Sequence, residues 1–461
     1  MENKIIKILI ILFVMIFHTP FANAVILTHP DNDCMTVDED GIFFSGKIHK
    51  YEKVYIDGVP IIPAKSGAFS YSVPLKIGEN IFAVQSKDWL GNKTTKKYVI
   101  TRVSKERNKN TDTFIETEKS YYKTIRDNVV LRSTPLDMGM NRLGYLAKDT
   151  KVYIDGQFNE FSRIYLSEDN YGWAMTKDLE KIEETKYIPI TLVSTDKVKT
   201  EKETTYIFTC TDNMTYSAIV NDNKLVLTIY NLDNQNEKYI QEFKFDKFPR
   251  YSILVQNSIL YLTFKNNPLD KNNYSNKNVK IIIDPGHGGR ELGAIGCLGH
   301  KEKTLNLEVA LKLKKILEEH QYNVKLTRET DKYVSINDRI KFAQDNDALI
   351  FISIHQNSVP ISKNPLLNEG TVVFYFNPQS MELAQTLSKS VSQALLVNNQ
   401  GATQASFAVI RPTEYIGVLA ELIYLVNPND VSIYKQKKFA RTSALAIYNG
   451  LSSYLHIEMN K

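Results

Sequence analysis

The first residue with clear chemical potential is a histidine that follows an apolar run. His287 comes after the β-branched stretch 281–283 and the pair Pro285-Gly286. A short apolar run that stops at Pro-Gly is typical of a buried strand followed by a tight turn. In open α/β sheets, functional side chains gather beyond the carboxyl ends of the strands. His287 therefore stands where a functional histidine is expected, although a histidine that only decorates a turn has the same signature.

A second histidine and a glutamate can reach the same edge of such a sheet. His355 ends the apolar run 348–354, and Glu302 lies just before an amphipathic helical segment. Two histidines and one carboxylate form a catalytic zinc ligand set whose fourth position is left to water. We therefore predict that His287, Glu302 and His355 bind one Zn²⁺ ion. His300, two residues before Glu302, is the less favoured candidate.

Glu421 is a carboxylate inside the otherwise apolar run 417–425. A buried carboxylate costs free energy unless it is paired or bound, and burial raises its pKa toward the range of a general acid or base. We predict that Glu421 is the catalytic base beside the metal. A buried ion pair or an edge position in the sheet are its structural alternatives.

Three further polar residues lie near these positions. Asn357 follows His355 by two residues and is predicted either to bind substrate or to orient His355. Arg328 and Arg339 are expected to make structural ion pairs, with contact to substrate carboxylates as the alternative.

The elements that must position these residues change character along the chain. Beyond residue 279, apolar β-branched runs alternate with segments of helical period, which predicts an α/β domain with a mostly parallel sheet flanked by helices. Upstream, short alternating runs separated by turn signals predict three small all-β modules. The predicted modules span 25–104, 121–183 and 185–265, and the predicted α/β domain spans 279–456.

The first 24 residues are predicted to be an export signal. Lys4 and Lys7 precede the apolar run 8–17, and Ala22-Asn23-Ala24 has the form of a cleavage site. We expect a cleaved signal peptide at 1–24, with an uncleaved anchor as the alternative. The mature protein is then extracytoplasmic, in a periplasm or a cell wall, with no transmembrane segment after cleavage.

Charge and cysteine content exclude several classes of protein. The net charge is only +5, charges of both signs are interspersed, and no basic stripe is seen. The sequence therefore does not indicate nucleic-acid binding. The chain has three cysteines, Cys34, Cys210 and Cys297, which are too far apart to indicate a disulfide framework or a cysteine zinc site.

Four ordered motifs give the C-terminal part a family resemblance. They are Asp-Pro-Gly-His-Gly-Gly at 284–289, Glu-Lys-Thr-Leu-Asn-Leu at 302–307, Ser-Ile-His-Gln-Asn-Ser at 353–358, and Glu421 before Asn-Pro at 427–428. This set resembles the zinc-dependent N-acetylmuramoyl-L-alanine amidases over about 279–455. The resemblance implies that His287, Glu302 and His355 hold Zn²⁺ and that Glu421 is the catalytic glutamate. It also implies cleavage of the peptidoglycan amide between N-acetylmuramic acid and the L-alanine of the stem peptide.

The upstream modules have looser resemblances. The first resembles bacterial immunoglobulin-like domains, the second a bacterial Src-homology-3-like barrel, and the third the amidase N-terminal targeting domain. The first resemblance implies a role in spacing or adhesion, and the other two imply that the modules bind the wall, with peptidoglycan as the partner.

Two departures from the amidase pattern, Gln356 and Tyr415-Ile416-Gly417, put the fit of the substrate in question. The short segment 356–370 predicts a site without a long occluding helix. A different zinc hydrolase acting on wall peptides or acetyl groups, or a wall-binding protein with an inactive site, are the alternative functions.

Overall fold

The computed structural model describes residues 25–104, 113–183, 189–221, 223–234, 237–246, 248–266 and 276–460. The predicted signal peptide at 1–24 lies outside the described residues. None of the helices within these ranges is long and apolar enough to cross a membrane.

The C-terminal domain is built on a six-stranded sheet in the order β24-β23-β25-β28-β26-β27. The first four strands of this order run parallel, whereas β26 is antiparallel to β28 and parallel to β27. The strands are β23 (Lys280–Pro285), β24 (Asn323–Leu326), β25 (Ile350–Asn357), β26 (Thr371–Tyr375), β27 (Asn399–Gln404) and β28 (Ile416–Tyr424). The predicted α/β domain with a mostly parallel sheet is therefore confirmed.

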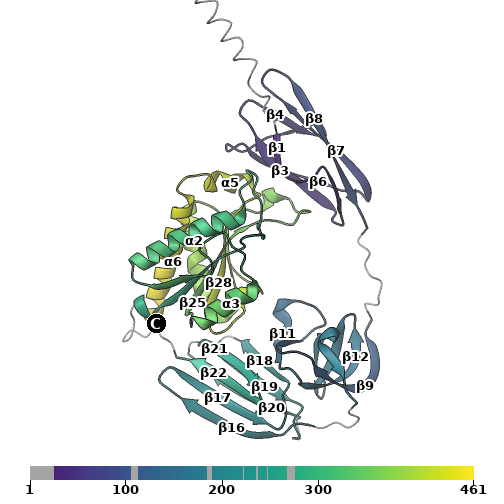
Figure 1. Ribbon diagram of the computed structural model, residues 1–461, viewed down its shortest axis with the longest axis vertical. Helices are drawn as coiled ribbons and strands as arrows, with labels where there is room; N and C mark the ends of the chain where they lie inside the picture. The colour runs from purple at the N-terminus through teal and green to yellow at the C-terminus, as the bar shows by residue number, and fades with distance from the viewer. Residues whose placement is uncertain are drawn as a thin grey trace, which may run out of the picture.

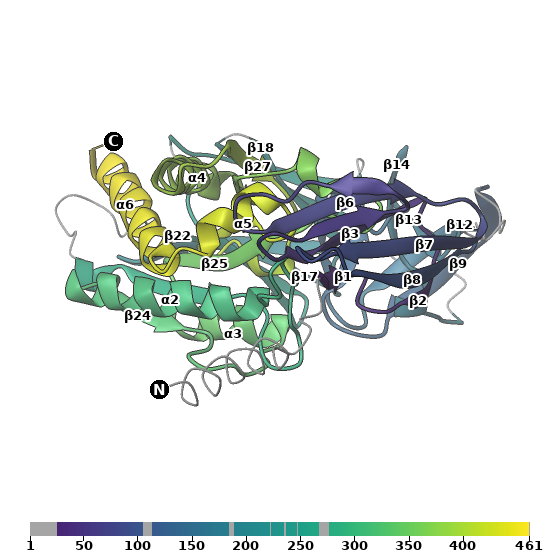
Figure 2. The same ribbon diagram turned by 90° about the horizontal axis from the view of Figure 1, so that it is seen from above.

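Helices cover both faces of this sheet (Figures 1 and 2). The apolar sides of α2, α4 and α6 share one core with one face, while α3 and a short 3-10 helix pack on the other. Both cores are needed because parallel strands are apolar on both faces. The helices are α2 (Glu302–Glu319), α3 (Ile336–Asp345), α4 (Met381–Leu395), α5 (Pro428–Tyr434) and α6 (Phe439–Asn460), and the 3-10 helix is η6 (Ala408–Ile410).

The first β module, residues 25–104, has two sheets, β1-β3-β6 and β2-β8-β7-β4-β5. Its core contains Phe44, whose ring meets Phe82 and Tyr98 edge to face. The strands are β1 (Val25–His29), β2 (Cys34–Val37), β3 (Gly41–Ile48), β4 (Lys53–Ile56), β5 (Val59–Ile61), β6 (Ala68–Pro74), β7 (Gly78–Lys87) and β8 (Lys93–Arg102).

The second β module, residues 113–183, is one seven-stranded sheet in the order β11-β10-β14-β13-β12-β9-β15. Its small core is formed by aliphatic side chains such as Leu131, Ile154 and Leu166. The strands are β9 (Ile115–Thr124), β10 (Val129–Arg132), β11 (Arg142–Leu146), β12 (Lys151–Phe158), β13 (Phe161–Ser167), β14 (Asn170–Met175) and β15 (Leu179–Lys181).

The third β module, described between 189 and 266, has two sheets, β16-β17-β22-β21 and β18-β19-β20, around one aromatic-rich core. Its strands are β16 (Leu192–Lys199), β17 (Glu203–Cys210), β18 (Tyr216–Asn221), β19 (Lys224–Tyr230), β20 (Lys238–Lys244), β21 (Tyr251–Gln256) and β22 (Ile259–Lys265). The predicted all-β character of the upstream chain is thus confirmed.

The first and third β modules contact the C-terminal domain at opposite ends of its strands, above and below the sheet in Figure 1. At the carboxyl edge, the Ser70 hydroxyl of the first module donates to the Val426 carbonyl at 2.7 Å. At the amino edge, Arg250 Nη1 of the third module donates to the Glu414 carbonyl at 2.9 Å. The first module therefore lies on the same edge as the ends of β23, β25 and β28.

Candidate metal centre

His287 is placed by a turn that brings two strand ends into close contact. A Cβ on Gly286 would lie 2.1 Å from Cε1 of His355, so only glycine fits between the two histidines. His287 itself has a φ of 58°, a left-handed conformation that a non-glycine residue adopts at a cost. Its backbone is held there by Arg339, whose Nη2 donates to the His287 carbonyl at 2.9 Å.

Two buried arginines hold this turn in place through hydrogen bonds. Arg339 Nη1 donates to Asp284 Oδ1 at 2.5 Å, an ion pair between two side chains that are each at most 5% exposed. Arg328 Nη2 donates to the carbonyls of Gly286 and Lys303, both at 2.9 Å. The expected structural role is confirmed for Arg339 as an ion pair, whereas Arg328 serves by holding backbone carbonyls.

The three predicted metal ligands come together at this edge of the sheet. One ligand atom from each of His287, Glu302 and His355 lies within 4.8 Å of the other two. Glu302 Oε2 lies 3.1 Å from Nε2 of His287, and Glu302 Oε1 lies 2.9 Å from Nδ1 of His355. The two imidazole rings meet edge to face with centroids 5.0 Å apart. The ligand atoms of all three residues thus converge on one point.

Glu302 is the first residue of α2, where the helix N-terminus favours a carboxylate. Its Oε2 accepts a hydrogen bond from the Ala294 N–H at 2.8 Å. Burial acts to raise the pKa of Glu302, but hydrogen bonds from His287 and His355 outweigh it and lower that pKa. The carboxylate is therefore ionised, as a metal ligand must be.

Two residues behind the cluster hold Glu302 in place. Asn306, one helical turn later, donates to Glu302 Oε1 at 3.2 Å, and the Gln356 N–H donates to the same oxygen at 3.2 Å. The Gln356 amide in turn donates to Asn306 Oδ1 at 3.3 Å. Both residues lie in motifs identified from the sequence, but this supporting role was not predicted there. The i, i+4 spacing of Glu302 and Asn306 on one helix face was the available signal.

Glu421 lies directly beside the cluster, because it is the register partner of His355 on the neighbouring strand. Its Oε2 is buried and has no hydrogen-bond partner among the described residues. Burial raises the pKa of Glu421 to about 8; the charge of His355 opposes this rise and that of Glu302 adds to it. The site thus contains a carboxyl group that can exchange a proton near neutral pH.

The residues fit a divalent metal ion on these observations. The donor set is two imidazoles and one carboxylate, which suits zinc with an open coordination position. Gly293 leaves room for it, since a Cβ there would lie 2.4 Å from Glu302 Oε2 and 2.7 Å from Cδ2 of His287. Burial acts to lower the pKa of His355, but the hydrogen bond and charge of Glu302 outweigh it and raise that pKa.

Two other predicted candidates are not among the three converging ligands. The Asn357 side chain accepts a local hydrogen bond from the Ser358 N–H at 2.8 Å, and no described hydrogen bond joins it to His355. The His300 ring packs against Tyr434, with centroids 5.0 Å apart. Between β25 and β26, the only described helix is the three-residue 3-10 helix Pro365–Leu367, so the described residues hold no long helix there.

The part of the chain that contains the cluster is similar in sequence to known proteins. Residues 281–453 match the family model described as N-acetylmuramoyl-L-alanine amidase. A probable cell wall amidase LytH of Staphylococcus epidermidis is 38% identical over 194 residues, which are 41% of this chain and 63% of that protein. A probable cell wall amidase LytH of Staphylococcus aureus is 33% identical over 176 residues, 38% of this chain and 57% of the relative. The chain therefore spans less than two thirds of the length of these curated relatives.

Solved structures are also similar to part of the chain. The catalytic domain of CwlV, an N-acetylmuramoyl-L-alanine amidase from Bacillus (Paenibacillus) polymyxa var. colistinus, is 32% identical, with a TM-score of 0.36. The similarity covers 39% of this chain and 98% of that structure. An N-acetylmuramoyl-L-alanine amidase from Clostridium difficile 630 is 32% identical, with a TM-score of 0.37, over 40% of this chain and 98% of that structure.

Proposed function

We propose, from the premise that residues 281–453 form an N-acetylmuramoyl-L-alanine amidase domain, that this protein is a zinc-dependent peptidoglycan hydrolase. Its substrate bond is the amide between the lactyl group of N-acetylmuramic acid and the L-alanine of the stem peptide. The observation that carries the proposal is the convergence of His287, Glu302 and His355 within 4.8 Å, with Glu421 as the strand neighbour of His355.

His287, Glu302 and His355 would hold the zinc ion. Bound there, zinc supplies Lewis acidity, which polarises a carbonyl and makes a neighbouring water more acidic. Asn306 and Gln356 keep the Glu302 carboxylate oriented through hydrogen bonds at 3.2 Å. Arg328 and Arg339 keep the His287 turn rigid, so the chain holds its ligands before any substrate binds.

Glu421 transfers the proton from the attacking water to the leaving group. As the water oxygen attacks the amide carbon, the Glu421 carboxylate takes a proton from that water. When the C–N bond breaks, the same group delivers the proton to the nitrogen of the leaving L-alanine. Oε2 of Glu421 is suited to this role because it has no hydrogen-bond partner among the described residues that would hold the proton elsewhere.

The upstream modules are proposed to bring the domain to its substrate. We assign the first β module to the immunoglobulin-like type, the second to the bacterial Src-homology-3-like type and the third to the amidase targeting type. Together with export by the signal peptide at 1–24, this places the enzyme outside the cytoplasm on peptidoglycan. Asn357 remains proposed as a substrate contact.

A digest of purified peptidoglycan tests the proposal. The full chain is incubated with muropeptides that carry stem peptides, and mass spectrometry identifies the new end groups. A free L-alanine amino terminus together with an intact lactyl group supports the amidase. An internal peptide cut would indicate a peptidase, released acetate would indicate a deacetylase, and an unchanged digest would indicate an inactive wall-binding protein.

A further inference from the structure

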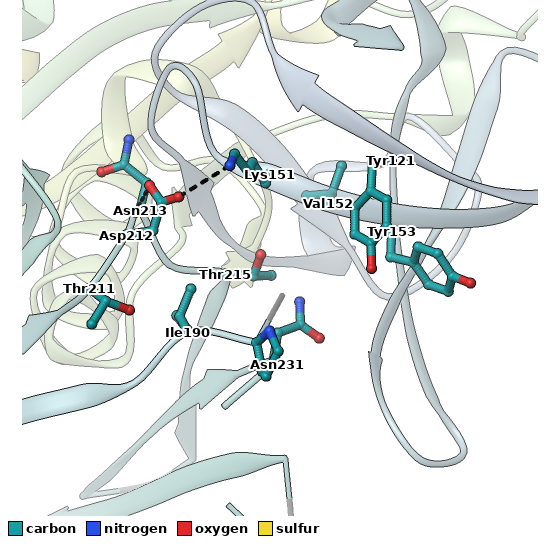
Figure 3. Close-up of a pocket in the computed structure, with 11 residues that line it drawn as sticks. Tyr121, Lys151, Val152, Tyr153, Ile190, Thr211, Asp212, Asn213, Thr215 and Asn231 are labelled. Atoms are coloured by element: carbon teal, nitrogen blue, oxygen red, sulfur yellow. Dashed lines mark hydrogen bonds and ion pairs between the residues drawn. The ribbon is translucent and has the colours of Figure 1, made fainter. Parts of the chain in front are cut away.

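A cavity of about 210 Å³ lies where the second and third β modules meet, and its lining includes none of the metal ligands (Figure 3). The second module lines it with Tyr121 and Tyr153, and the third module lines it with Ile190, Thr215 and Asn231. Pockets for drug-sized ligands are about 300–1,000 Å³, so this cavity suits a smaller group such as a single ring.

The polar end of the cavity holds two groups without partners. Thr215 is 2% exposed, and neither its hydroxyl nor Oδ1 of Asn231 has a hydrogen-bond partner among the described residues. Leaving such groups buried and unpaired costs free energy, so native structures rarely keep them without a purpose. Both residues also line the cavity.

The backbone holds these two residues in fixed positions. The Thr215 carbonyl accepts a hydrogen bond from the Tyr230 N–H at 2.9 Å, and the Asn231 carbonyl accepts one from the Ile190 N–H at 2.9 Å. Asn231 has a φ of 60°, a conformation that asparagine tolerates better than most residues. The cavity is therefore preformed, which lowers the entropic cost of binding.

The other walls are aromatic and aliphatic. The Tyr121 and Tyr153 rings lie 4.9 Å apart at an interplanar angle of 42°, and Val152 and Ile190 add aliphatic surface. Tyrosine offers a large apolar face together with a polar edge, which suits ligands that are themselves apolar on one side and hydroxylated on the other.

Charge is confined to the rim of the cavity. Lys151 and Asp212 form an ion pair of 3.7 Å, and their side chains are 42% and 44% exposed. These two charges compensate each other, and Thr215 and Asn231 at the polar end are neutral. The chemistry favours a neutral ligand over a carboxylate, a phosphate or a free amine.

We propose that this cavity binds one pyranose ring of an N-acetylated amino-sugar glycan. Oδ1 of Asn231 can accept a hydrogen bond and the Thr215 hydroxyl can donate one, which complements the N–H and C=O of an acetamido group. The C–H face of the ring packs on the tyrosine wall. The choice of an amino sugar rests on the proposed peptidoglycan substrate, whereas the neutral, hydroxylated class rests on the cavity itself.

Binding of chitotriose to the full chain tests this inference, measured by isothermal titration calorimetry. Chitotriose has no lactyl amide, so its binding does not depend on hydrolysis. Thr215→Val keeps the shape and removes the hydroxyl, and we expect about tenfold weaker binding with an unchanged or higher melting temperature. Asn231→Gly keeps the backbone conformation and should also weaken binding. Ser167→Ala is the matched control. Ser167 in the second module is equally buried and has no hydrogen-bond partner among the described residues, but it does not line the cavity.

Several outcomes would overturn the inference. These are the absence of chitotriose binding to the wild-type chain, binding that Thr215→Val and Asn231→Gly leave unchanged, or capture of a stem pentapeptide in place of the sugar. Loss of sugar binding with normal muropeptide digestion refutes this site alone. Normal sugar binding without amide cleavage refutes the proposed function alone.

Discussion

Gly293 offers the sharpest test of how the metal site is built. Its φ is 68°, and an added Cβ would lie 2.4 Å from Glu302 Oε2 and 2.7 Å from Cδ2 of His287. Gly293→Ala therefore forces the carboxylate away from the point where the three ligands converge. The added Cβ would also lie 2.8 Å from Cβ of Glu302, so the collision displaces both the carboxylate and the start of α2, which carries it.

Gly401 in β27 provides a matched control. Its φ is 82°, and a Cβ there would meet nothing within 4 Å. Both alanine variants pay about 1–2 kcal/mol of unfolding free energy for the left-handed backbone. Only Gly293→Ala adds the collision with the ligands. The difference between the two variants thus isolates the effect on the metal site.

The expected losses follow from that displacement. Disturbing the support of a metal ligand typically lowers metal affinity about 10–100-fold, and misplacing reacting groups by about 1 Å costs about 100-fold in rate. Competition with a chromophoric chelator measures zinc affinity, and denaturant unfolding measures stability. The reasoning is refuted if Gly293→Ala binds zinc as tightly as the wild-type chain, or if Gly401→Ala loses as much affinity.

Two further predictions concern the buried groups of the fold. Arg339→Met leaves Asp284 buried without its cation and should lower the unfolding free energy by about 3–5 kcal/mol, measured by urea denaturation. The double variant with Asp284→Asn should recover part of that loss. Strictly additive losses in the two single variants and the double variant would contradict the pairing. Burial raises the pKa of the Cys210 and Cys297 thiols to about 11, so both stay protonated at pH 8 and become thiolates only near pH 11. Alkylation of the native chain at pH 8 should therefore modify exposed Cys34 alone, as read by peptide mass spectrometry, and rapid modification of Cys297 would contradict this.

The positions of the candidate ligands were predictable because their signals are local. His287 and His355 each end an apolar run, and parallel strands bring their carboxyl ends to one edge of the sheet. Glu421 was visible as a charge within an apolar strand, where burial needs a reason. Each of these inferences depends on fewer than ten consecutive residues and on one topological rule.

Other parts of the domain could not be predicted from the sequence, because their residues have weak or misleading secondary-structure preferences. The strand β27 has the sequence Asn-Gln-Gly-Ala-Thr-Gln, which has little strand propensity and is held by pairing with β26. The apolar residues Ala408–Ile410 have a composition that suits a strand, but they form a 3-10 helix that covers one face of the sheet. In both cases tertiary contacts override local preference.

The supporting contacts were hidden because they join residues far apart in the sequence. The hydrogen bond from Arg339 Nη2 to the His287 carbonyl spans 52 positions. The cavity between the second and third modules forms only when Tyr121 and Thr215 meet across a module boundary. Such contacts follow from how whole elements pack, which residue pattern alone does not determine.

The central claim is that Glu421 transfers the proton in amide hydrolysis at a zinc site held by His287, Glu302 and His355. The direct test compares the wild-type chain with Glu421→Gln at equal zinc content, counting L-alanine amino termini released from muropeptides over time. We predict equal zinc binding and a rate about 100–10,000-fold lower for Glu421→Gln. Release of L-alanine termini by Glu421→Gln at the wild-type rate would contradict the account.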